Sequence, residues 1–74
     1  MATVRIDGWR PGFDKVGHTH ALQSHGHLSL SSAKAITDAV LERTPQEIAV
    51  PSQDQAEALA GLLHSLGANA QVVS

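Results

Sequence analysis

The histidines are the residues of this chain whose type and spacing most openly suggest chemistry. Four of the five histidines lie within residues 18–27, in the segment HTHALQSHGH. Histidine is the commonest metal ligand in proteins, and it is also the side chain that most readily changes its charge near neutral pH. The segment therefore has three possible roles: a metal site, semi-buried packing, or a polar surface that recognises a partner.

The metal role depends on whether the segment is a strand or a helix. On a strand, His18 and His20 point to the same side, about 7 Å apart. On a helix they lie about 200° apart, and His18 and His25 share a face at roughly 10 Å along the axis. Zinc–nitrogen bonds are about 2 Å long, so a helix excludes a two-histidine clamp here. His25 and His27 with a third ligand remain the weak metal alternative.

The local sequence leaves the conformation of this segment open. Gly17, Thr19 and Ser24 are mediocre helix formers. The same residues also show a strand-like alternation, with Val16 and Leu22 on one side. The histidines are therefore interpreted first as partly exposed polar residues on an interaction face.

Composition excludes several function classes. The chain has 74 residues, a net charge of −2, 3% aromatic residues and no cysteine. A nucleic-acid binder would usually carry a basic stripe with stacking aromatics, and without cysteine there is no disulfide or thiolate ligand. No apolar run suits a signal peptide or a membrane span. We expect a single small domain, residues 1–74, that is cytoplasmic and binds neither membrane nor nucleic acid.

The C-terminal helix is the clearest element that positions these residues. Ser52 and Gln55 form a capping box, and Gly67 follows the last helical residue, where a left-handed conformation is common. These signals predict a helix over residues 52–66, followed by a strand over residues 69–74. Its predicted core face consists of Ala56, Leu59, Ala60, Leu63 and Leu66.

The rest of the chain predicts a second helix and two further strands. Ser29 or Ser31 can cap a helix that ends before Pro45, with a core face of Ala33, Ile36, Val40 and Thr37. Residues 2–6 and 47–50 have strand character. Residues 7–13 are rich in turn formers, and Asp14 can cap a helix. Trp9, in this turn-rich stretch, is predicted either to cover the small core or to contact a partner.

Several short motifs resemble a known family. They are Lys15-Val16, LSLSSAK from Leu28, Pro45, AEAL from Ala56 and GANAQV from Gly67. Over about residues 3–73 they are similar to the C-terminal domain of the bacterial ribosomal stalk protein, which contacts translation GTPases. The resemblance implies an α+β fold of β-α-α-β-α-β order, a two-layer sandwich in which three helices cover a three-stranded antiparallel sheet. It also implies that residues 15–24 are helical.

The resemblance implies a partner-binding face on the first helix and the start of the second. By position the face falls on Lys15, Val16, Thr19, His20, Gln23, Leu30, Ser31, Ser32 and Lys34. Lys15, Val16, Leu30 and Lys34 keep the family's residue types, whereas His20, Gln23 and Ser31 stand where the family has basic residues. The face is therefore expected to persist with fewer fixed positive charges.

We expect a non-enzymatic protein–protein interaction module that needs no cofactor and is a monomer as an isolated chain. Its partner would be a GTPase, an adaptor target or a toxin neutralised by an immunity-type protein. The stretch from Ile6 to Phe13 also resembles, more distantly, the first loop of the Clp-protease adaptor for N-degron substrates. The alternative from a different class is a histidine-based metal-binding module. No nucleophile or phosphate-binding motif supports an enzyme.

Overall fold

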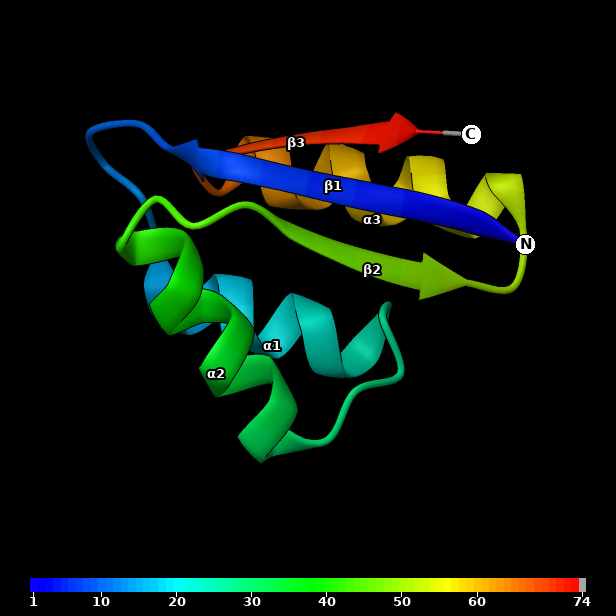
Figure 1. The fold of residues 1–74 in the computed structure, drawn as a ribbon, viewed down its shortest axis with the longest axis horizontal. Helices are drawn as coiled ribbons and strands as arrows, with labels where there is room; N and C mark the ends of the chain where they lie inside the picture. The colour runs from blue at the N-terminus through cyan, green and yellow to red at the C-terminus, as the bar shows by residue number, and fades with distance from the viewer. Residues whose placement is uncertain (74) are drawn as a thin grey trace.

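The elements follow one another in the order predicted from the sequence. The structure, a computed structural model, describes residues 1–73. The elements are β1 (Ala2–Trp9), α1 (Lys15–Ser24), α2 (Leu30–Leu41), β2 (Gln46–Val50), α3 (Gln53–Ser65) and β3 (Ala68–Val73). The expected α+β class is confirmed: three helices accompany a three-stranded antiparallel sheet (Figure 1).

The sheet has β1 at its centre, with the order β2-β1-β3. Val4 pairs with Ile48 of β2 on one side and with Val72 of β3 on the other. Alternate residues face the helices and are buried, as Val4 and Ile6 show, while the intervening residues remain on the open face. On that open face Arg5 forms ion pairs with Asp7 and Glu47.

The helix α3 forms as its capping signals predict. The Ser52 hydroxyl accepts a hydrogen bond from the Gln55 N–H at 3.2 Å. The chain then leaves the helix at Gly67, whose φ is +100°. A Cβ atom at this position would lie 2.8 Å from the Phe13 Cα, so both the conformation and the close approach require glycine. This turn brings β3 back beside β1.

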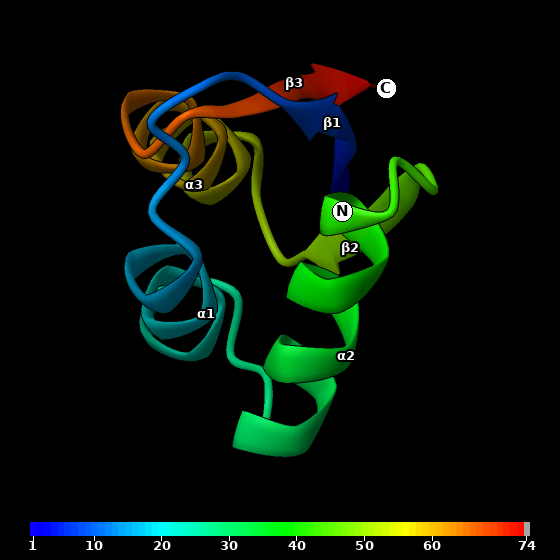
Figure 2. The same ribbon diagram turned by 90° about the vertical axis from the view of Figure 1, so that its left-hand side faces the viewer.

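The helices α1 and α2 also start at predicted caps. The Asp14 carboxylate accepts from the Gly17 N–H at 2.9 Å, and the Ser29 hydroxyl accepts from the Ser32 N–H at 3.2 Å. The helical conformation implied for residues 15–24 is thereby confirmed. In Figures 1 and 2, α1 lies farther from the sheet than α3 does, and it packs mainly on α2 and α3.

The turn predicted over residues 7–13 is wrong in its first part. The strand β1 continues through Asp7 and Gly8 to Trp9, which pairs with Ala68. The register shifts between Ile6 and Trp9, and such an irregularity lets a glycine-containing stretch remain in the sheet. The extension carries the Trp9 ring toward the C-terminal end of α2, where its indole N–H donates to the Leu41 carbonyl at 3.0 Å.

The helices of the described residues 1–73 are too short and too polar to cross a bilayer. The core that they share with the sheet is small and aliphatic. Its largest fully buried apolar side chains are Ile6, Leu22, Leu59 and Leu63. Because so few large side chains fill it, each one contributes a large share of the stability.

Truncating Leu63 tests this packing. Leu63→Ala is expected to lower the free energy of unfolding by about 2–5 kcal/mol, the usual range for a buried leucine. The matched control is Leu30→Ala, because Leu30 is 53% exposed and loses few contacts. Urea denaturation followed by circular dichroism measures both. A loss below about 1 kcal/mol at Leu63 would contradict the packing of α3 described above.

Candidate functional site

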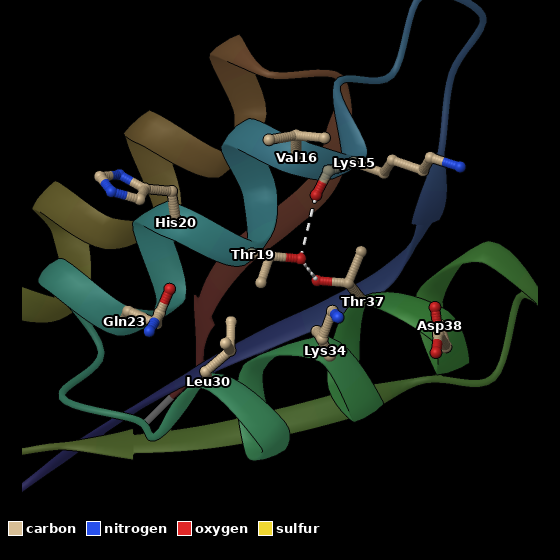
Figure 3. Close-up of a pocket in the computed structure, with 9 residues that line it drawn as sticks. All are labelled: Lys15, Val16, Thr19, His20, Gln23, Leu30, Lys34, Thr37 and Asp38. Atoms are coloured by element: carbon tan, nitrogen blue, oxygen red, sulfur yellow. Dashed lines mark hydrogen bonds between the residues drawn. The ribbon is translucent and has the colours of Figure 1, made fainter.

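A groove runs between α1 and α2 on the surface away from the sheet. It has a volume of about 420 Å³. Figure 3 shows that its walls come from these two helices alone. The lining residues are Lys15, Val16, Thr19, His20, Gln23, Leu30, Lys34, Thr37 and Asp38.

The residues of each wall recur with helical spacing. On α1, Lys15, Thr19 and Gln23 are four residues apart, and on α2, Leu30 and Lys34 have the same spacing. Side chains four residues apart lie above one another on one face of a helix. The groove is therefore formed by two whole helix faces that lie opposite each other.

Two apolar side chains in the groove remain exposed. Val16 is 74% exposed and Leu30 is 53% exposed, and with Met1 they are the exposed large hydrophobic residues of the part of the chain described. They come from different helices and line the same groove. An apolar patch with polar residues around it is typical of a surface that binds a partner.

The charged groups of the groove lie around this apolar pair. Lys15 extends from α1, and Lys34 and Asp38 extend from α2 (Figure 3). Both ion pairs found within residues 1–73 involve Arg5, so neither lysine is paired with a carboxylate there. The two ammonium groups are thus available to a bound molecule.

A chain of hydrogen bonds connects the wall of the groove to the core. The Thr19 hydroxyl lies 3.0 Å from the Lys15 carbonyl oxygen and 2.9 Å from the Thr37 hydroxyl (Figure 3). The Thr37 hydroxyl lies 2.9 Å from Nδ1 of His18. Each hydroxyl has one hydrogen and the Lys15 carbonyl can only accept, so all three contacts are satisfied together only when Nδ1 carries the proton of neutral His18.

His18 is a core residue, and its placement on the interaction face from the sequence is wrong. Its side chain is fully buried, with the Phe13 ring edge-on at 5.1 Å between centroids. Nε2 has no hydrogen-bond partner. Protonation would give that nitrogen a buried N–H with no acceptor, and burial lowers the pKa of His18 from 6.5 to about 4.

The remaining predicted partner-binding residues lie outside the groove. Ser31 and Ser32 are exposed in the first turn of α2. Trp9 is half-buried, its indole N–H is bonded within the chain, and the Arg43 guanidinium lies 4.7 Å from the centroid of its ring. A partner-binding role for Trp9 stays a prediction, separate from the groove.

The other three histidines of the segment lie at different places along α1 and the loop that follows it. His20 lines the groove, His25 caps the C-terminal end of α1, and His27 lies in the following loop with φ of +57°. Within residues 1–73, no group of three or more His, Asp or Glu side chains is placed to hold a metal ion. His25 and His27 therefore have no third ligand in this part of the chain.

Sequence reasoning missed two residues of the groove, Thr37 and Asp38. The sequence contains the pattern that indicates them, because Thr37 and Asp38 follow Lys34 by three and four residues and so lie on the same face of the helix. The sequence places Thr37 only on the core face, whereas this residue also lines the groove.

Comparisons with protein-family models, with curated proteins and with solved structures found no match to this chain.

Burial of His18 predicts that the domain loses stability in acid. The pKa of His18 is lower in the folded state than in the unfolded chain, so below pH 6.5 the unfolded state binds more protons and stability falls until about pH 4. One pKa unit corresponds to about 1.4 kcal/mol, so the loss attributable to His18 is about 2 kcal/mol at pH 5. Urea titrations at pH 7 and pH 5 measure it.

The control for this experiment is a pair of matched variants. His18→Gln removes the titrating group and is expected to show a smaller loss between pH 7 and pH 5 than the parent. His20→Gln, at an exposed histidine of the same helix, is expected to keep the parent's loss. Equal pH dependence of stability in the parent and in His18→Gln would contradict the claim that buried His18 causes the loss in acid.

The absence of a third ligand beside His25 and His27 gives a prediction about metals. Adding a chelator is expected to leave the melting curve unchanged, because the caps and the apolar core are complete without an ion. Zinc titration followed by amide shifts gives the site-specific measurement. A cooperative melt that disappears with chelator would support the metal-binding alternative instead.

Proposed function

We propose that this domain is a protein–protein interaction module that binds its partner in the groove between α1 and α2. The observation that carries the proposal is the exposure of Val16 and Leu30 on facing helices of one groove. The volume of about 420 Å³ suits one or two side chains of a partner. The resemblance of the sequence to the ribosomal stalk domain supports the same face.

The chemistry of the groove also describes the partner. An apolar side chain seated between Val16 and Leu30 would bury surface that water now covers, at about 25 cal/mol per Å². Lys15 and Lys34 outnumber the single carboxylate of Asp38 in the groove, so the groove favours carboxylates beside that side chain. Pairs at the edge of an interface mainly steer association and set specificity, so the apolar contact supplies most of the affinity. The partner is thus a protein surface with an apolar anchor flanked by acidic residues.

Substituting the apolar centre tests the proposal. Leu30→Asp places a charge in the apolar contact and is expected to abolish partner binding, since truncating a central anchor costs more than removing a charge from the edge. Because Leu30 is 53% exposed, the melting temperature is expected to stay close to that of the parent. A photo-crosslinking residue at position 16, followed by mass spectrometry, identifies the partner. The same capture with Leu30→Asp measures how much partner binding is lost.

The matched control is Ala58→Asp, which adds the same charge at an exposed position of α3. This control is expected to retain every partner that the parent captures. A partner that binds Leu30→Asp with unchanged affinity would move the interface away from the groove, and the surface around Trp9 would then be the better candidate.

A further inference from the structure

We propose that the free edge of β3 pairs antiparallel with the same edge of a second copy of this chain, which makes the domain a two-fold dimer. The three-stranded sheet has two outer edges, one on β2 and one on β3. An edge strand presents unpaired N–H and C=O groups, and natural proteins usually protect such an edge with prolines, charges or a covering element. The two edges of this sheet differ sharply in that protection.

The edge on β2 is protected. Pro45 precedes the strand and Pro51 follows it directly, and neither residue has a backbone N–H to donate. Glu47, the second residue of the strand, carries a carboxylate that pairs with Arg5 at 3.0 Å. A second chain that paired with this edge would therefore lie beside the Glu47 carboxylate and would find no backbone N–H at Pro45 or Pro51.

The edge on β3 has none of these protections. Its sequence, ANAQVV, contains no charge and no proline. The Arg10 guanidinium reaches the Ala68 carbonyl and the Asn69 side chain, so it occupies only the start of the strand. From Ala70 to Val73 the register with β1 is regular. In Figures 1 and 2 the far end of β3, next to the C-terminus, lies at the border of the molecule.

These features favour a second copy as the occupant of the edge. A neutral strand offers no charge to attract an acidic or basic peptide, whereas it is compatible with itself. Pairing of β3 with β2 of another copy would be a head-to-tail contact, which builds a ring or an open filament instead of a two-fold dimer. The prolines around β2 oppose that contact, and pairing of β3 with β3 closes after two copies.

The geometry of such a dimer places Gln71 near the two-fold axis. Residues directly opposite each other in an antiparallel pair point to the same face of the sheet. When the helices of both copies lie on one side of the joined sheet and the two-fold axis passes at Gln71, each Gln71 lies opposite its own counterpart. The helices α1 and α2, whose residues line the groove, lie at the far side of the molecule from β3 (Figure 2), so the dimer would carry two accessible grooves.

Sedimentation equilibrium over about 10 µM to about 1 mM, a range that resolves weak association, tests the dimer. The average mass is expected to rise with concentration from 7.8 kDa toward twice that value. Gln71→Lys is expected to weaken self-association about tenfold or more, because like charges directly opposite each other repel. An equimolar mixture of Gln71→Lys and Gln71→Glu is expected to restore it.

Two controls separate this edge from the rest of the surface. Ala49→Lys adds the same charge at an exposed position of β2 and is expected to leave self-association unchanged, as is Leu30→Asp in the groove. A mass of 7.8 kDa at every concentration would overturn the proposal and support the monomer expected from the sequence. A dimer that survives Gln71→Lys but not Leu30→Asp would also overturn it, because the groove would then be the contact between copies.

Discussion

The placement of α1 depends on one buried imidazole. This helix packs mainly on α2 and α3 rather than on the sheet, and its buried side chains are His18, Ala21 and Leu22. Alanine fills little space, so the leucine and the histidine provide most of the contact. His18 contributes in its neutral form, with Nδ1 satisfied by Thr37 of α2. A charged ring in the same place would need an acceptor at Nε2 that the core does not supply.

The burial of His18 decides which side chains of α1 line the groove, because successive residues of a helix are rotated by about 100°. With His18 directed inward, Val16 and His20 each lie about 160° away from it, on the side that faces outward. Both line the groove, and Val16 is the more exposed member of its apolar pair. Thr19 lies between the two directions, which is why its hydroxyl reaches both the Lys15 carbonyl and Thr37. The buried His18 and Leu22 therefore determine which face of α1 is exposed in the groove.

The elements could be predicted wherever local signals decide them. Ser52 with Gln55, Ser29, Asp14 and Gly67 mark helix ends through backbone groups that are close in sequence. The extension of β1 to Trp9 could not be predicted this way, because the bulge that keeps Gly8 in the sheet depends on pairing with distant β3. The burial of His18 depends likewise on Thr37, nineteen residues away. A histidine beside exposed histidines gives no local sign that it has a partner in the core.

Apart from Thr37 and Asp38, the groove residues are those that the resemblance implies, and the exposure of Val16 and Leu30 carries a physical argument of its own. The core of this domain is built largely from alanine and a few leucine, isoleucine and valine side chains, and a chain of this length has little stability in reserve. Val16 and Leu30 would add to that core if they were turned inward. Both instead face solvent across one groove, and neither contributes to the buried cluster. Substitutions at these two positions can therefore separate binding from folding, which substitutions at His18 or Leu63 cannot do.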